Sequence, residues 1–259
     1  MIKRVLIHIL LLTLSFQLLS KELLVGINER NIYRYQQNGA WAGIDVELIQ
    51  AAAQHAGYKI EIIAMPWARV LESLKDGKID VTLAAANSSE RSQYAHFSNH
   101  NFRASHYVLF VRKEKLPLFS NVKSLADIID TNASIGALRG AIYSTEHYAL
   151  LKSTEFQKKI VLIDNDQSLP LLALKGRVDG YIDSDIEGKH YLSNSLTNQQ
   201  KIVPLITINQ GAQSNTHLMF SKKTVSEVMV KQFDEALYNI HKTGLYNSII
   251  EKYSLLPGQ

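Results

Sequence analysis

Short apolar runs alternate with helix-patterned segments, and this alternation limits the fold more than any other feature of the sequence. The first unit has an apolar run at 23–27, a helical stripe over 45–56 that closes at Gly57, and an apolar run at 58–63. The order then repeats, with strands expected at 79–84, 134–138, 159–163 and 178–182 and helices expected at 67–75, 144–151 and 169–174. Such alternation is typical of parallel α/β units, so we expect an α/β fold.

The C-terminal part carries a clear amphipathic helix pattern. Thr224 and Glu227 have the spacing of a capping box, and the apolar stripe that follows ends before Gly244. Its members are Met229, Phe233, Ala236, Leu237 and Ile240. No Pro- or Gly-rich linker divides the chain, and the strand-rich stretch 97–112 indicates two α/β lobes joined by extended crossover strands.

Residues 1–20 have the layout of a secretory signal peptide. Lys3 and Arg4 precede an apolar run at 5–19, and the small Ser20 comes just before a polar pair. A membrane anchor is the alternative, but the run is shorter than the roughly 20 residues that cross a bilayer. We therefore expect cleavage near Ser20 and export of a soluble chain to the periplasm.

Charge and cysteine content exclude several classes of function. Without Lys3 and Arg4, the 28 Lys and Arg become 26 against 24 Asp and Glu, a balance of +2 that argues against nucleic-acid binding. The chain has 0 cysteines, which excludes a disulfide scaffold, a thiolate zinc site, a cysteine nucleophile and a lipid attached to an N-terminal Cys.

The stretch 84–91 has the chemistry of an anion site. It follows an apolar strand and starts a helix, for which Asn87 is the expected N-cap with Glu90 three residues on. Backbone N–H groups at a helix start, together with the guanidinium fork of Arg91, suit a small organic carboxylate. The alternative is an ordinary capped helix with a surface arginine.

Two further segments are candidates for the same cleft. The junction 138–144 places Gly140, which permits close backbone approach, before the capping residue Ser144. Asp183 and Asp185 follow a strand and could hold a ligand ammonium, which needs a partner when buried. A plain turn and a solvated acidic loop are the alternatives. Three aromatic residues could line the pocket or, alternatively, pack in the core: Tyr33, Tyr35 and Trp67.

Five short motifs in order resemble the extracytoplasmic solute-binding proteins, family 3, which serve amino-acid ABC importers. The resemblance covers residues 23–253. The motifs are Gly43-Ile44-Asp45-Val46-Glu47-Leu48, Leu74 to Asp80, Ser88-Ser89-Glu90-Arg91 with Phe97-Ser98, Gly176-Arg177-Val178-Asp179, and Gly244-Leu245-Tyr246 with Lys252-Tyr253.

The resemblance implies a two-lobe periplasmic-binding-protein fold of type II with hinge crossover strands. Lobe 1 would comprise 21–110 and 211–259, and lobe 2 would comprise 111–210. The implied function is capture of a small carboxylate-bearing solute, a polar amino acid or derivative, by hinge closure. Delivery would be to the membrane permease of an ABC importer, by a monomer without cofactor, metal or catalytic residues.

The resemblance also assigns roles to residues. Arg91 would hold the ligand α-carboxylate, and an Asp after the 178–182 strand, Asp183 or Asp185, would bind the α-ammonium. The pocket would also include Ala84, Ala86 and Ser88 and backbone N–H groups of Gly140, Ala141 and Ile142. Beside these residues we expect the side chains of Asn28, Tyr33 and Trp67 to line the pocket.

Four departures from the family pattern affect the ligand. Ala86 replaces a Ser or Thr, Ser184 falls at the spacing of the ammonium-binding Asp, and Asn28 stands where an acidic sensor is frequent. Trp67-Ala68-Arg69 adds a ring and a second cation. An α-amino acid, a dicarboxylate, a modified amino acid and a small peptide fragment all stay open.

Three other functions are alternatives. A cyclohexadienyl or arogenate dehydratase-like enzyme would need an acid, for which Glu29 or Asp183 are candidates. A ligand sensor without a transporter would keep the binding site. His96, His100 and His106 are close in sequence, but the extended segment between them gives no reason for their rings to converge, so we expect no metal site.

Overall fold

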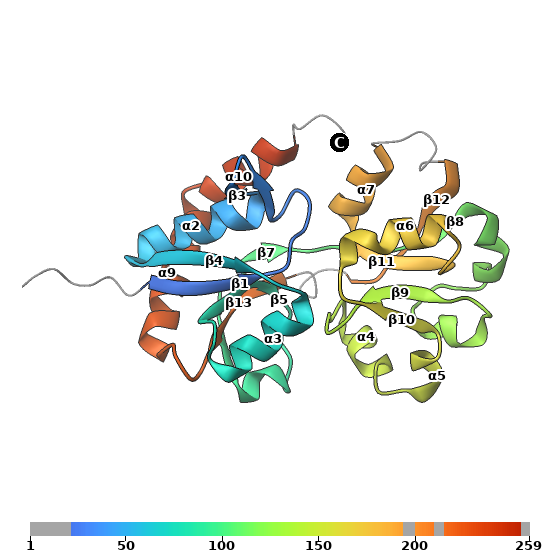
Figure 1. Ribbon diagram of the computed structural model, residues 1–259, viewed down its shortest axis with the longest axis horizontal. Helices are drawn as coiled ribbons and strands as arrows, with labels where there is room; N and C mark the ends of the chain where they lie inside the picture. The colour runs from blue at the N-terminus through green and yellow to red at the C-terminus, as the bar shows by residue number, and fades with distance from the viewer. Residues whose placement is uncertain (1–21, 194–199, 210–214, 255–259) are drawn as a thin grey trace, which may run out of the picture.

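Two α/β lobes lie side by side, each around its own sheet (Figure 1). The computed structural model describes residues 22–193, 200–209 and 215–254. The prediction of an α/β fold is confirmed.

The expected signal peptide at 1–20 lies outside the described residues. Within those residues, no helix has the length and apolar character needed to cross a membrane.

Lobe 1 is built on a sheet with the strand order β4-β1-β5-β13-β6. Strands β1, β4 and β5 are parallel, as the sequence pattern predicts, whereas β13 runs antiparallel to β5 and β6. Helices α2, α9 and α10 cover one face, and α3 packs on the other. The bounds are β1 Glu22–Ile27, β4 Lys59–Ala64, β5 Val81–Ala85, β6 Ala95–Phe97, β13 Asn215–Ser221, α2 Ile44–Ala56, α3 Trp67–Asp76, α9 Glu227–Lys242 and α10 Leu245–Ser254, with a small hairpin of β2 Tyr35–Gln37 and β3 Ala40–Ala42.

Lobe 2 repeats this plan with the strand order β10-β9-β11-β8-β12. Strands β9, β10 and β11 are parallel, and β8 is antiparallel to both of its neighbours. The bounds are β8 Tyr107–Arg112, β9 Ile135–Leu138, β10 Ile160–Ile163, β11 Gly180–Ser184, β12 Ile202–Thr207, α4 Thr145–Leu150, α5 Thr154–Gln157, α6 Leu169–Leu174 and α7 Asp185–Ser193, with 3-10 turns η2 Lys113–Phe119, η3 Ala126–Asp130 and η4 Asp166–Ser168. A further 3-10 turn, η1 Arg91–Gln93, belongs to lobe 1, where it lies between β5 and β6.

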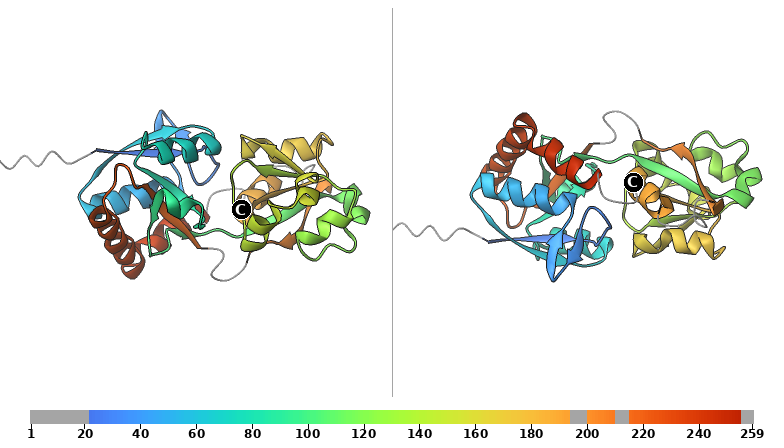
Figure 2. Two further views of the ribbon diagram at one scale, coloured as in Figure 1. Left: turned by 90° about the horizontal axis from the view of Figure 1, so that it is seen from below. Right: turned by 90° about the horizontal axis from the view of Figure 1, so that it is seen from above.

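The chain crosses between the lobes twice, after β7 (Arg103–Ala104) and after β12, and the crossing from β7 to β8 is visible in both views of Figure 2. Asn209 ties the two crossings together, because its Oδ1 accepts from the Tyr107 N–H at 2.7 Å and its Nδ2 donates to the Ser105 carbonyl at 2.7 Å. The expected lobe boundary at 110 falls inside β8, which pairs only with lobe 2 strands among the described residues. The other boundary, between 210 and 211, lies outside the described residues.

Helix α9 confirms the predicted apolar stripe but not its predicted cap. Its five stripe residues are buried, and the Phe233 ring packs 5.3 Å from that of Phe220 on β13. The helix begins one residue after Ser226, whose hydroxyl accepts from the Met229 N–H at 3.4 Å. The capping box expected at Thr224 is therefore wrong, since a serine nearer the first turn takes that role.

A buried histidine in lobe 2 gives the fold a pH dependence. His147 on α4 packs between the rings of Tyr143 and Phe156, and the described residues give neither ring nitrogen a hydrogen-bond partner. Burial lowers the pKa of His147 from 6.5 to about 4. The unfolded chain therefore binds more protons than the folded chain in this interval, and stability is lost as the pH falls through it.

We expect His147→Phe to remove this loss. Urea unfolding at pH 4 to 7 should show the variant gaining up to about 3 kcal/mol on the wild type as the pH falls, because a shift of one pKa unit corresponds to about 1.4 kcal/mol. The control His55→Phe, at an exposed position, should keep the wild-type decline. A difference between His147→Phe and wild type that stays constant with pH would contradict this account.

Candidate functional site

A pocket between the lobes collects buried arginines around Arg91. Arg91 is 5% exposed, and its guanidinium donates to the Ala86 carbonyl at 2.8 Å and to the Gly140 carbonyl at 2.7 Å. Its backbone N–H donates to the Ser88 hydroxyl at 3.3 Å. The described residues supply Arg91 with no ion-pair partner, and burial lowers its pKa. The site therefore holds a desolvated cation whose charge is not neutralised locally.

Trp67 and the turn at Gly140 bring the two lobes into contact beside Arg91. The Trp67 Nε1 donates to the Gly140 carbonyl at 3.2 Å, and the Arg91 Cζ lies 5.8 Å from the centre of the indole ring. Gly140 has a φ of +78°, which favours glycine. The Ala141 N–H donates to the Leu138 carbonyl at 3.1 Å. The turn thus offers the pocket a carbonyl, and of the three backbone N–H donors that the resemblance implied, that of Ala141 is bonded within the turn.

A tight turn after β1 supplies two more arginines. Arg30 and Arg34 exchange backbone hydrogen bonds of 2.8 Å, and between them Ile32 has a φ of +65°, a strained conformation for a β-branched residue. The start of α2 holds this turn, since the Ile44 N–H donates to the Ile32 carbonyl at 2.9 Å. At Gly43 a Cβ would approach the Tyr33 carbonyl oxygen to 2.3 Å, so glycine is required there.

Asp45, in the first turn of α2, binds two of the arginines. Asp45 is fully buried. Its Oδ2 lies 3.2 Å from the Arg34 Nη1 and also accepts a hydrogen bond from the Arg103 Nη2 at 3.2 Å. Its Oδ1 accepts a hydrogen bond from the Arg103 Nε. The Arg103 guanidinium also stacks 3.9 Å above the Tyr33 ring. One carboxylate therefore pairs with two guanidinium groups and balances only one of their two charges, and the segment Gly43-Ile44-Asp45 has a structural role at the site.

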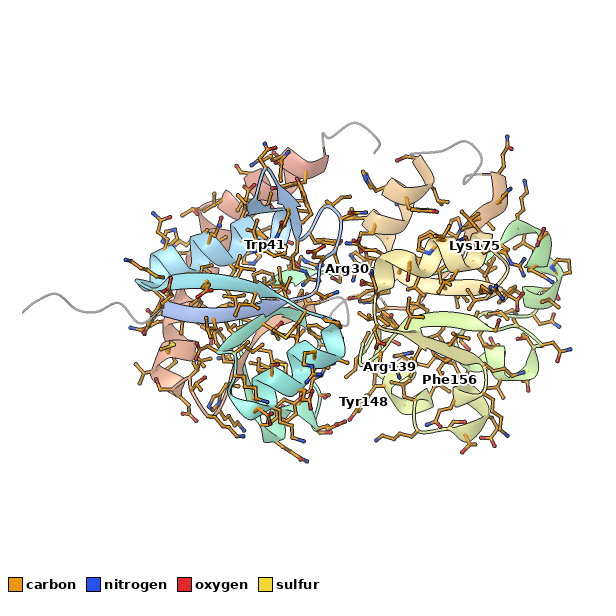
Figure 3. The ribbon with its side chains drawn as sticks, viewed as in Figure 1. Arg30, Trp41, Arg139, Tyr148, Phe156 and Lys175 are labelled. Atoms are coloured by element: carbon orange, nitrogen blue, oxygen red, sulfur yellow. The ribbon has the colours of Figure 1, made fainter. Side chains whose placement is uncertain are left out.

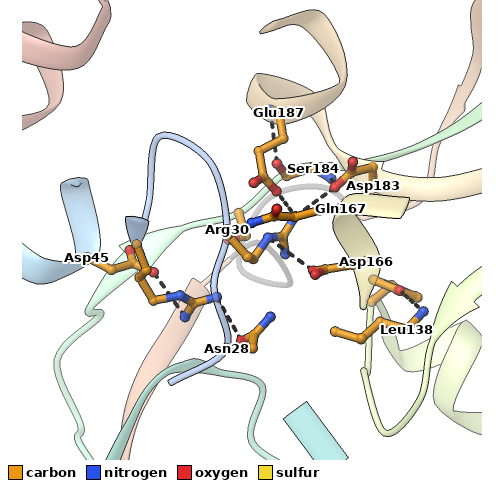
Figure 4. A network of polar contacts seen from close by, with 12 residues as sticks. Asn28, Arg30, Asp45, Leu138, Asp166, Gln167, Asp183, Ser184 and Glu187 are labelled. Atoms are coloured by element: carbon orange, nitrogen blue, oxygen red, sulfur yellow. Dashed lines mark hydrogen bonds and ion pairs between the residues drawn. The ribbon is translucent and has the colours of Figure 1, made fainter. Parts of the chain in front are cut away.

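Arg30 reaches from lobe 1 into a cluster of three lobe 2 carboxylates, which we call the acid trio: Asp166, Asp183 and Glu187 (Figures 3 and 4). Its Nε lies 3.2 Å from the Asp166 Oδ2 and its Nη2 lies 2.6 Å from the Asp183 Oδ1, with Glu187 also paired to Nη2. Burial opposes the charge on Arg30, but the trio outweighs it and raises the Arg30 pKa. Burial and mutual repulsion raise the pKa of Asp183 and of Glu187.

The structure brings together part of the predicted site. Pocket-lining positions include Asn28, Trp67, Ala84, Ala86, Arg91, Ala141 and Ile142. Ser88 lines an adjoining cavity. Gly140 contributes its carbonyl from the rim, and Tyr33 lies in the lobe 1 core beneath the arginines.

The predicted ammonium partners do not reach the pocket. Asp183 faces Arg30 in the acid trio, and Asp185 lies on the outer side of α7, where it pairs with Lys189 at 2.9 Å. Ser184, at the spacing of the family aspartate, accepts from the Glu187 N–H at 3.2 Å. Helix α7 begins at Asp185 directly after β11, so this carboxylate pairs with a lysine one turn along the same helix.

Several other expectations near the site need correction. Helix η1 begins at Arg91, after Glu90, so Asn87 is not its N-cap and instead accepts from the Ser92 hydroxyl at 3.0 Å. Arg69 is exposed and pairs with Glu72 at 3.0 Å, away from the pocket.

The histidines singled out in the sequence have separate surroundings. The His100 ring packs 5.5 Å from that of Tyr238, and His106 is exposed. Within the described ranges, no group of three or more His, Asp or Glu residues is arranged to hold a metal ion.

Sequence reasoning missed the arginines other than Arg91. Arg30, Arg34 and Arg103 all line the pocket, as does Tyr107. The sequence does contain a signal for two of them, because Arg30 and Arg34 stand four residues apart shortly after the buried strand β1. Charged residues at such a place usually belong to a turn exposed to solvent, so the pattern alone does not indicate a pocket.

The sequence pattern of the bacterial extracellular solute-binding proteins, family 3, matches residues 23–255. Among curated proteins, a probable histidine-binding protein of Neisseria gonorrhoeae is 23% identical over 89% of this chain and 86% of its own length. The arginine-binding extracellular protein ArtP of Bacillus subtilis is 23% identical over 90% of this chain and 86% of its own length.

Solved structures share the fold. An amino-acid ABC transporter substrate-binding protein, AbpA of Streptococcus pneumoniae bound to L-arginine, has a TM-score of 0.72 and 21% identity, covering 90% of this chain and 94% of that one. A histidine kinase sensor domain similar to periplasmic binding proteins has a TM-score of 0.74 and 23% identity, covering 90% of this chain and 96% of that one.

We expect Asp45→Asn to destabilise the protein strongly. Without this carboxylate, two buried guanidinium groups lose their shared partner, a loss typically of about 3–5 kcal/mol in the free energy of unfolding, measurable by urea denaturation. The control is Asp164→Asn, which breaks the exposed 2.8 Å pair with Arg139 and should cost less than about 1 kcal/mol. Equal effects of the two variants would contradict the role assigned to Asp45.

Proposed function

Because the chain belongs to the bacterial extracellular solute-binding proteins, family 3, we propose that it captures a small carboxylate-bearing solute of the amino-acid class between its lobes. It delivers the solute, in the periplasm, to the membrane permease of an ABC importer. The observation that carries the proposal is Arg91, a buried guanidinium in the pocket between the lobes with no carboxylate partner among the described residues.

The chemistry of Arg91 favours a carboxylate ligand. A guanidinium binds a carboxylate through two parallel N–H···O bonds, which are stronger than bonds to neutral carbonyls. In this structure Arg91 donates to two such carbonyls, of Ala86 and Gly140. A ligand carboxylate in this pocket would supply the missing negative charge.

Closure of the lobes is the mechanism of capture. Arg91 and Trp67 come from lobe 1 and both donate to Gly140 in lobe 2, so the pocket is complete only when the lobes meet. A ligand that contacts both lobes binds the closed arrangement better than the open one and shifts the population toward it. The permease would then recognise the closed form.

The relatives support the transport role. Their names describe histidine-, arginine- and L-cystine-binding proteins, which are all amino-acid binders. An enzyme of the dehydratase type is disfavoured because the two acids considered for it do not line the Arg91 pocket: Glu29 is exposed and Asp183 is paired with Arg30.

We expect Arg91→Ala to weaken binding of the solute by about ten- to a hundredfold, because charge-assisted hydrogen bonds contribute roughly 1.5–3 kcal/mol. Thermal unfolding against a panel of amino acids and dicarboxylates identifies the solute, since a ligand at about 100 times its Kd stabilises by about 2.7 kcal/mol. Calorimetry then measures the Kd of the variant.

The matched control is Arg69→Ala, which removes an exposed guanidinium from α3 and should leave the affinity unchanged. Full affinity in Arg91→Ala would refute the carboxylate assignment. Turnover of a cyclohexadienyl acid by the purified protein would instead favour the enzyme.

A further inference from the structure

The acid trio is already occupied by a cation from the chain itself. Arg30 contacts all three carboxylates, and the four side chains are each no more than 9% exposed. A ligand ammonium that sought these carboxylates would have to displace the Arg30 guanidinium. Asp183 and Glu187 line a different cavity, together with Asn31 and His190, so Arg30 stands between the trio and the Arg91 pocket.

The Arg91 pocket itself has an excess of positive charge. Its ionisable lining consists of Arg30, Arg34, Arg91 and Arg103 together with tyrosines, and no carboxylate lines it among the described residues. Within the described part of the chain, Arg30 is neutralised by the trio, whereas Arg34 and Arg103 share Asp45 alone and Arg91 has no ion-pair partner. Two positive charges in excess therefore face the pocket, and ligand charge must supply their balance, because unpaired buried charge is strongly unfavourable.

A second anion position is indicated by unpartnered donors. Asn28 and Arg34, at 6% and 4% exposure, both line the pocket, and the Arg34 Nη2 donates to the Asn28 Oδ1 at 3.0 Å. This bond leaves the Asn28 Nδ2 and the Arg34 Nε without an acceptor among the residues that the structure describes. A carboxylate oxygen is an acceptor that suits both. Arg91 and this Asn28–Arg34 pair thus form two separate places for negative charge.

We propose that the pocket selects a net-negative ligand with two carboxylates, one on Arg91 and one at the Asn28–Arg34 pair, and that Arg30 excludes cationic amino acids by filling the acid trio. The proposal rests on the proposed function, since it assigns the ligand class of the same pocket. Apolar side chains of Leu83, Leu138 and Ile142 line the pocket as well, which fits the short methylene chain of such a ligand. The recognised feature is the second negative charge and not an ammonium.

The test is calorimetric titration of the whole protein with L-glutamate, glutarate, L-glutamine and L-arginine. L-glutamine matches L-glutamate in shape and lacks one charge, so it should bind at least tenfold more weakly, as should L-arginine, whereas glutarate should bind within tenfold of L-glutamate. Equal or tighter binding of L-glutamine or L-arginine would overturn the proposal. Absence of binding by either dicarboxylate at 10 mM would also overturn it.

Arg30→Gln tests the exclusion of cations. Because it frees the acid trio, the affinity for L-arginine relative to L-glutamate should rise at least tenfold. The control Arg139→Gln removes a guanidinium from an exposed Arg–Asp pair and should leave this ratio unchanged. An unchanged ratio in folded Arg30→Gln would overturn the role of Arg30.

A further variant covers the case in which Arg30→Gln does not fold. Asn28→Ala should weaken L-glutamate about tenfold and L-glutamine less than twofold, and an equal loss for both would overturn the second carboxylate position. Failure of the proposed function gives a different pattern, because Arg91→Ala would then keep full affinity. Binding that depends on Arg91 but prefers L-glutamine would leave the proposed function standing and remove this inference.

Discussion

Pairing of buried arginines with buried carboxylates is the interaction on which the centre of this molecule depends. Asp45 holds Arg34 and Arg103 inside lobe 1, and the acid trio holds Arg30 across the gap between the lobes. Such pairs gain little over apolar packing, yet removal of one partner leaves an uncompensated charge. These ion pairs therefore determine which side chains face the pocket. The turn at Ile32 holds its strained backbone conformation because the same ion pairs and the start of α2 hold the residues around it.

The network links the fold to the ligand. Each lobe places the carboxyl ends of its parallel strands toward the other, and there the chain leaves β1 and β5 in lobe 1 and β9 and β11 in lobe 2 (Figure 1). α/β folds bind ligands at these ends. Here the carboxylates of one lobe are taken by Arg30, so the remaining pocket is cationic. Because the protein itself does not neutralise the positive charge of this pocket, the solute has to bring negative charge.

Much of the fold could be predicted from the sequence, and less of the site. The strands and helices of the parallel units have strong periodic signals, and the observed elements lie within about two residues of those expected. Helix α7 was missed because its sequence, with a central glycine at 188, gives no apolar stripe. Arg91 could be placed through its strand-to-turn setting. Arg30 could not be assigned to the site from the sequence, because its partners lie more than 130 residues away along the chain and pair with it only when the lobes meet. These partners are Asp166, Asp183 and Glu187.

The crystal structure of the protein with glutarate tests the central claim most directly, because it locates both carboxylates and Arg30 at once. We predict one carboxylate within about 3 Å of the Arg91 guanidinium, the other at the Asn28 Nδ2 and Arg34 Nε, and Arg30 still paired with the acid trio. A ligand bound with no carboxylate on Arg91, or one that displaces Arg30 from the trio, would contradict the account.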